Sequence, residues 1–212
     1  MTDEGTRRSE RVEILATILL ALATVATAWS GYQASRWNGE QAKAAAKASA
    51  LRIESVKADG LANAQSQIDV AVFTQWVDAY ARGEKQLADF YLERFRAEFK
   101  PAVDAWIATR PLQNPDAPLT PFAMPEYRLE AREEAGRLEA ASDVAAAAAR
   151  ESLQRATNYV LAVVFFAAAL FLGGMSARLR TLGLRRALAI VGLVVFLGAA
   201  AWIATFPVSV SV

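Results

Sequence analysis

The sequence predicts an all-α membrane protein with three transmembrane helices and an extramembrane antiparallel helical bundle, whose helices continue into spans one and two. Three uncharged apolar runs predict the spans: 14–35, 159–177 and 187–212. The region between the first two runs has the composition of helices. Hydrophobic residues make up 54% of the chain and charged residues 21%, so the two kinds must be separated along it, as they are here.

The C-terminal runs predict a helical hairpin. Run 159–177 has 19 residues, or about 29 Å at ~1.5 Å per residue, which matches a hydrocarbon core of ~30 Å. We place transmembrane helix 2 at 158–177, transmembrane helix 3 at 187–207 and a tail at 208–212. The loop 178–186 contains four arginines and no acidic residue. Because arginines near span ends set orientation, we expect this loop to be cytoplasmic. The topology-determining residues are then Arg178, Arg180, Arg185 and Arg186.

The N-terminal segment agrees with this orientation. Residues 1–11 form a cytoplasmic tail with three arginines, and transmembrane helix 1 occupies 12–35. The polar block, 36–157, is then extracytoplasmic, and the protein is a multi-pass protein of an inner (plasma) membrane. Basic residues also flank this block, but long segments translocate largely regardless of charge. An alternative is that the first run is a signal peptide with a cleavage site at Ala26-Thr27-Ala28.

Turn signals divide the polar block into four predicted helical segments in an up-down-up-down bundle. We place breaks at Asp59-Gly60, at Gly83 and in a proline-rich loop, 110–125, and a kink or restart at Lys100-Pro101. The last segment, 126–158, runs into the second span, with favourable ion pairs expected for Glu133/Arg137 and Glu151/Arg155. An apolar stripe predicts one buried face in the second segment: Ile68, Val72, Trp76 and Ala79.

The predicted core packs large aromatic side chains against small alanines. The alanines lie at 44–46 and 145–149. The aromatic residues are Phe73, Trp76, Tyr80, Phe90, Tyr91, Phe95, Phe99 and Trp106.

The candidate functional residues form a juxtamembrane group just outside the first span. They repeat at three and four residues, which places them on one side of a helix, where they would couple the outer domain to the spans or anchor the interface: Tyr32, Gln33, Arg36, Trp37 and Glu40. The proline-rich loop is a second candidate, with Phe122 and Met124 either docked on the bundle or presented to a partner. Small residues spaced by four also predict close helix packing: Ala23, Thr27, Gly31, Ala169, Gly173 and Ala177.

Composition excludes several classes of function. The formal charge of +1 argues against a nucleic-acid partner. The chain has no His and no Cys, so it lacks the commonest general base, metal ligand and thiol nucleophile. The carboxylates between 130 and 143 alternate with arginines and predict a solvated face rather than a metal site. We therefore expect no enzyme activity, no cofactor and no metal.

Two stretches resemble a family of small bacterial integral-membrane proteins with no assigned activity. They are 28–41, Ala-Trp-Ser-Gly-Tyr-Gln-Ala-Ser-Arg-Trp-Asn-Gly-Glu-Gln, and 95–127 with its Asn-Pro-Asp-Ala-Pro core. The resemblance implies a bacterial membrane location and no catalytic residue. We expect a membrane-anchored interaction or sensing module whose partners are the lipid bilayer and either further copies of the chain or another membrane or envelope protein. The alternative is a homo-oligomeric channel or transporter-like protein lined by Thr17, Thr24 and Thr27.

Overall fold

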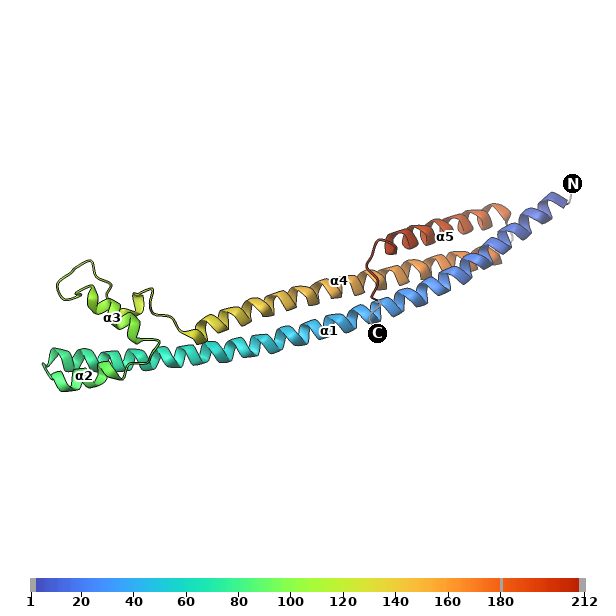
Figure 1. Ribbon diagram of the computed structural model, residues 1–212. Coiled ribbons are helices and arrows are strands. Elements are labelled where there is room, and N and C mark those ends of the chain that lie inside the picture. Colours follow the sequence, from blue (N-terminus) through green and yellow to red (C-terminus); the bar gives the residue numbers. More distant parts are fainter. Residues whose placement is uncertain (1–2, 180, 210–212) are drawn as a thin grey trace. The chain divides into compact units, whose positions relative to one another are not determined.

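The computed structural model describes residues 3–179 and 181–209, and leaves out the side chains of 3–12, 15 and 182. These residues form helices and connecting turns, with no strand among them, so the all-α prediction is confirmed for this part of the chain (Figure 1). The elements are α1 (Asp3–Ala81), α2 (Lys85–Glu93), α3 (Lys100–Ala108), the 3-10 helix η1 (Pro121–Ala123), α4 (Glu130–Arg178) and α5 (Leu182–Ile203).

The chain divides into two compact units. The first, here called the apolar unit, is Met1–Ala46 with Ala145–Val212, and the second, the polar unit, is Lys47–Val144. Helices α1 and α4 contribute residues to both units. The prediction that helices of the polar block continue into the first two apolar runs is therefore confirmed.

Small residues bring the helices of the apolar unit together. An added Cβ at Gly173 of α4 would lie 3.6 Å from Leu20 Cδ2 of α1. One at Gly192 of α5 would lie 3.3 Å from Leu172 Cβ and 3.4 Å from the Ala169 carbonyl oxygen of α4. Ala23 and Ala169 are fully buried and Gly173 meets α1, so these members of the predicted small-residue stripes pack within one chain, whereas Gly31 and Ala177 are exposed.

Two helices of the described chain are long and apolar enough to cross a membrane, Glu130–Arg178 and Gly183–Ile203. They correspond to the predicted spans two and three. The segment 14–35 lies within α1 but is less apolar, because threonines, serines and Gln33 interrupt its aliphatic residues.

In the polar unit, α1 and α4 form an antiparallel pair. Ser142 Oγ donates a hydrogen bond to the Ala48 carbonyl (3.0 Å), and Ser55 Oγ donates to the Ala135 carbonyl (2.9 Å), so numbers rise on α1 as they fall on α4. The buried residues of α1 recur every seven positions: Ala48, Ser55, Ala62, Asp69 and Trp76.

The predicted break at Asp59-Gly60 is wrong, since α1 runs through it to Ala81. The Asp59 carboxylate lies on the helix surface, where it accepts a hydrogen bond from Asn63 (3.0 Å) and forms an ion pair with Arg132 of α4 (3.2 Å). Ala62, one turn on, is fully buried. The free energy gained from these tertiary contacts thus exceeds the cost of about 1 kcal/mol of a glycine in the helix interior.

The predicted break at Gly83 is confirmed. Gly83 has a φ of +75°, and the amides of Gly83 and Glu84 donate to the carbonyls of Tyr80 (3.1 Å) and Ala79 (3.0 Å). This is the glycine-terminated cap that satisfies the last carbonyls of a helix. Helices α2 and α3 that follow have nine residues each, and α3 restarts at Lys100 before Pro101. The polar unit is therefore a long helical pair with two short helices, and the prediction of four long segments is wrong.

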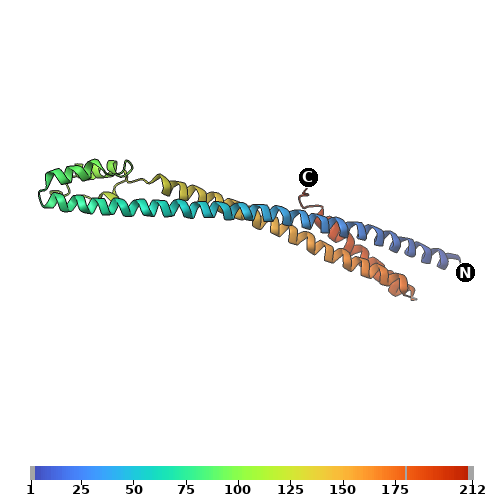
Figure 2. The same ribbon diagram turned by 90° about the horizontal axis from the view of Figure 1, so that it is seen from below.

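An aromatic cluster joins the Ala81 end of α1 to α2, α3 and the proline-rich loop, which lie beside it (Figures 1 and 2). Phe73, Trp76, Phe95 and Phe99 are buried there as predicted. Tyr80, Phe90 and Ile68 are exposed, which corrects their predicted burial. The rings pack chiefly on one another, as Phe99 does on Phe122 (5.0 Å between centroids), so the predicted packing of rings against alanines is wrong.

Candidate functional site

Gln33 is the fully buried member of the predicted juxtamembrane group. Its side chain is fully buried in the apolar unit and faces the backbone of Ser209. The Ser209 amide donates to Gln33 Oε1 (3.0 Å), and Gln33 Nε2 donates to the Ser209 carbonyl (3.5 Å). A side-chain amide thus pairs with a peptide group, as a neighbouring strand would, and holds the segment after α5 against α1.

Trp37 and Tyr159 surround this contact. Both are buried, and they form a cluster with Ala34 and Ala156 on which Ile203 and Phe206 pack. The Tyr159 hydroxyl donates to the Pro207 carbonyl (3.3 Å). The Arg155 guanidinium lies 4.5 Å from the centre of the Trp37 ring and also pairs with Glu151, so the expected Glu151/Arg155 pair is present.

The other predicted members are not brought into this contact. Tyr32 is 54% exposed and lies beside Trp29, with ring centroids 6.0 Å apart. Glu40 pairs with Lys43 (2.9 Å) on the helix surface. Arg36 is half-buried. Gln33 and Trp37 therefore lie on the inward side of the helix, whereas Tyr32 and Glu40 lie on its surface.

A buried carboxylate in the polar unit is a site that the sequence analysis missed. Asp69 is 1% exposed, and its Oδ2 accepts hydrogen bonds from Arg96 Nη1 (2.8 Å) and from the Tyr127 hydroxyl (3.2 Å). Arg96 also pairs with Glu98, whose Oε1 accepts from the Glu130 amide at the start of α4 (3.1 Å). The network therefore links α1 to the segments on either side of α3 and the proline-rich loop.

Burial raises the pKa of Asp69 above its usual value, because the charged form loses hydration. The Arg96 guanidinium and the Tyr127 hydroxyl oppose this rise. Burial also raises the pKa of the Tyr127 phenol. A signal for this site was present in the sequence, since an aspartate falls in the seven-residue series with Ala48, Ser55, Ala62 and Trp76.

The proline-rich loop docks on the polar unit. Pro121 is buried, Phe122 stacks on Phe99, and Trp106 Nε1 donates to the Pro118 carbonyl (2.7 Å). Of the two alternatives for Phe122, docking is the one observed. Two leucines of the loop remain exposed, Leu112 at 83% and Leu119 at 94%.

The predicted topology-determining arginines lie at the ends of α4 and α5. Arg178 is in the last turn of α4, Arg185 and Arg186 are in the first turns of α5, and Arg180 lies outside the described residues. Arg185 pairs with Glu13 of α1 (3.6 Å).

Other expected contacts can also be assessed. Arg137 pairs with Glu134 rather than with Glu133. Within the described part of the chain, no three carboxylates are placed to hold a metal ion. The hydroxyls of Thr17, Thr24 and Thr27 each donate to the carbonyl four residues earlier in α1 (2.7–2.9 Å). These hydroxyls therefore satisfy their own helix, and the contacts give no support to a polar lining.

Comparisons of the chain with protein families, with curated proteins and with solved structures found no match. The resemblance to a bacterial membrane protein family therefore stays a prediction.

Proposed function

We propose that this chain is a three-span membrane protein whose polar unit is an interaction module for a partner helix. Support for the membrane location comes from the surface of the apolar unit. Its large aliphatic and aromatic side chains are exposed on α1, α4 and α5, among them Val25 (68%), Phe171 (66%), Val194 (63%), Ile190 (60%) and Ile14 (59%). Its interior holds the polar side chains of Ser30, Gln33 and Ser176 beside small residues and the rings of Tyr159 and Phe166. An apolar exterior around an interior that holds polar groups suits lipid rather than water.

The segment 14–35, the first span along the chain, completes the three spans of this proposal. Its exposed side chains are apolar at Ile14, Ile18, Leu22 and Val25, whereas its polar Ser30 and Gln33 are fully buried. Ser30 and Gln33 therefore face the neighbouring helices, and the exposed Thr17 and Thr24 donate their hydroxyls to carbonyls of their own helix, so the side chains that would meet lipid are mainly aliphatic. The test for an alternative signal peptide is the N-terminus of the membrane-extracted protein, because cleavage would give a chain that starts at Trp29.

Cysteine labelling tests the orientation. The chain has no native Cys, so Thr181→Cys and Asn114→Cys each supply a single thiol. We expect an impermeant thiol reagent to label position 114 in intact cells, and position 181 only after lysis. Labelling of position 181 but not 114 in intact cells would invert the topology and contradict the extracytoplasmic placement of the polar unit.

The observation behind the interaction function is an uncharged exposed stripe on α1. In the polar unit, one stripe of exposed residues on α1 repeats at spacings of four and three and includes no charged residue: Ser49, Ile53, Val56, Gly60, Asn63, Gln67, Val70, Thr74 and Val77. These positions are distinct from the buried series that packs against α4, and among them Asn63 also accepts a hydrogen bond from Arg132 of α4 (2.7 Å). A repeat with a mean spacing of 3.5 residues is the pattern by which one helix packs along another in a coiled coil. The outer stripe thus has the spacing for a second helical neighbour.

Disulfide trapping identifies the partner. If the neighbour is a second copy in the same membrane, the two α1 helices are parallel and equivalent residues face each other. Ile53→Cys should then form a disulfide-linked dimer, whereas Glu54→Cys, which is exposed beside the stripe, should not. If Ile53→Cys stays monomeric, a photo-cross-linker at position 53 in native membranes should capture another envelope protein. Equal capture from positions 53 and 54 would contradict the stripe as an interface.

The continuity of α4 suggests how binding is transmitted. One residue inserted after Asn158 rotates the two parts of α4 by about 100° relative to each other. We expect this insertion to change the set of proteins cross-linked in native membranes, and an insertion beside the exposed Asp116 of the proline-rich loop to leave it unchanged. Identical cross-linking in both variants would exclude rigid coupling through α4.

A further inference from the structure

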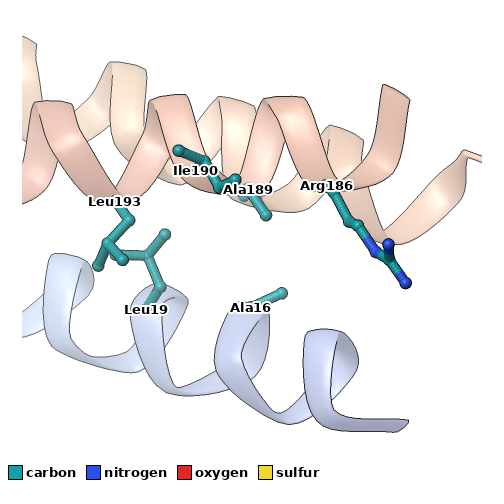
Figure 3. Close-up of a pocket in the computed structure, with 7 residues that line it drawn as sticks. Ala16, Leu19, Arg186, Ala189, Ile190 and Leu193 are labelled. Carbon is teal, nitrogen blue, oxygen red and sulfur yellow. The ribbon is translucent and has the colours of Figure 1, made fainter. Parts of the chain in front are cut away.

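A cavity of about 200 Å³ lies in the apolar unit, between the first described side chains of α1 and the first turns of α5 (Figure 3). Its walls are apolar: Ala16 and Leu19 of α1, Gly173 of α4, and Ala189, Ile190 and Leu193 of α5. The glycine and alanines create the space, because larger side chains there would fill it. Pockets for drug-sized ligands measure roughly 300–1,000 Å³, so this cavity suits part of a molecule rather than a whole one.

One cation completes the lining. Arg186 of α5 contributes the sole charged side chain among the lining residues, and it extends from α5 at one end of the cavity, past Ala16 (Figure 3). Arg186 is exposed, and among the described residues no carboxylate pairs with it, whereas the adjacent Arg185 pairs with Glu13. From Arg186 to Leu193 the cavity follows α5 for about 10 Å, at ~1.5 Å per residue.

The lining defines the chemistry of a ligand. A narrow apolar slot with a guanidinium at one end fits an amphiphile that has an anionic head and a hydrocarbon tail. Guanidinium groups bind phosphate oxygens well, because their N–H donors match the geometry of the anion. A wholly apolar ligand would leave Arg186 unused, and a small soluble anion would leave the slot unfilled.

We propose that this cavity binds an anionic phospholipid, with part of one acyl chain along Leu19 and Leu193 and the phosphate at Arg186. The inference rests on the proposed membrane location, since a lipid reaches the cavity only if the apolar unit lies in a bilayer. It goes further by assigning a particular lipid site to one face of the three helices.

Native mass spectrometry of the full-length protein in detergent micelles tests the site. We expect phosphatidylglycerol to be retained in preference to phosphatidylcholine. Arg186→Gln should weaken phosphatidylglycerol retention about fivefold, the effect of one basic residue near an anionic lipid surface. Arg178→Gln removes an equal charge from the exposed end of α4, outside the cavity, and should have little effect. Equal retention of the two lipids, or an equal loss in both variants, would overturn the proposal.

A second variant tests the slot. Ala189→Leu places a larger side chain in the cavity and should reduce retention of phosphatidylglycerol while leaving all the arginines in place. Inorganic phosphate and glycerol phosphate, added as competitors, should fail to displace the lipid, because they lack the acyl chain. Displacement by either would identify a soluble anion as the ligand and would overturn the lipid assignment.

Membrane extraction separates this inference from the proposed function. Wild type and all three variants should stay in the membrane pellet after alkaline carbonate treatment. A protein that stays in the pellet but shows no lipid preference contradicts the lipid site alone. A wild type released into the supernatant contradicts the membrane proposal, and the lipid site with it.

Discussion

The hydroxyl of Tyr127 donates a hydrogen bond to Asp69 Oδ2 across 3.2 Å, and this contact holds the end of the proline-rich loop against α1. Tyr127→Phe removes the donor but keeps the ring, which packs on Phe99 and Phe122. Because Arg96 still pairs with Asp69, we expect a modest loss of about 0.5–1.5 kcal/mol in local stability. Hydrogen exchange of residues 112–129 should become faster. Tyr80→Phe, at an exposed tyrosine, is the control, and equal effects of the two changes would contradict the role of the Tyr127 hydroxyl.

Asp69 should also make the stability of the polar unit depend on pH. Burial raises the pKa of Asp69 in the folded protein, so the folded state binds a proton more tightly than the unfolded state does. The Asp69 contribution to unfolding free energy is then highest below the ordinary carboxyl pKa, and it falls as pH rises through the raised pKa. Arg96, Glu98 and Tyr127 face the same carboxylate and modify the size of this effect.

Asp69→Asn isolates that dependence. We expect the unfolding free energy of wild type minus that of the variant to decrease as pH is raised from about 4 to 7, measured by chemical unfolding of the full chain in detergent. The exposed carboxylate of Asp116 provides the comparison. For Asp116→Asn, the difference in unfolding free energy from wild type should vary little with pH. A difference between wild type and Asp69→Asn that grows with pH would show that Arg96 outweighs burial.

Asp69 also illustrates which parts of the structure the sequence could predict. The all-helical composition, the break at Gly83 and the kink or restart at Lys100-Pro101 depend on local backbone chemistry and were predicted correctly. The helix through Asp59-Gly60 was not, because its continuity depends on packing against α4, which is distant in sequence: Ala62 is buried and Arg132 pairs with Asp59. Of the predicted stripe, Trp76 and Ala79 are buried, but Ile68 is exposed and Asp69 is buried beside it, since burial of Asp69 requires Arg96 and Tyr127. The Gln33 contact depends on Ser209, so its selection from the juxtamembrane group required the tertiary structure.

The aromatic cluster gives a direct test of core packing. Trp76 is 8% exposed and stacks near Phe73, with centroids 5.8 Å apart. Trp76→Ala should lower the unfolding free energy by about 3–5 kcal/mol, because it leaves a large cavity among rings that cannot collapse. Leu119→Ala removes a side chain that is 94% exposed and should change stability by less than ~0.5 kcal/mol. Denaturant unfolding of the purified full chain measures both, and a Trp76 effect as small as that of Leu119 would place the ring outside the core.

Gly192 and Gly198 of α5 provide a matched pair for the packing of the apolar unit. A side chain at Gly192 meets the Ala169 carbonyl oxygen, which cannot move unless α4 moves, whereas a Cβ at Gly198 has no heavy atom within 4 Å. Gly192→Leu should therefore push α5 away from α4 and lower stability by about 1–3 kcal/mol. Gly198→Leu adds the same atoms where no neighbouring side chain or backbone is close, so it should leave the stability nearly unchanged. The thermal midpoint in detergent and protease cleavage at residues 179–181 measure the difference, and equal behaviour of the two variants would contradict close packing of α5 on α4.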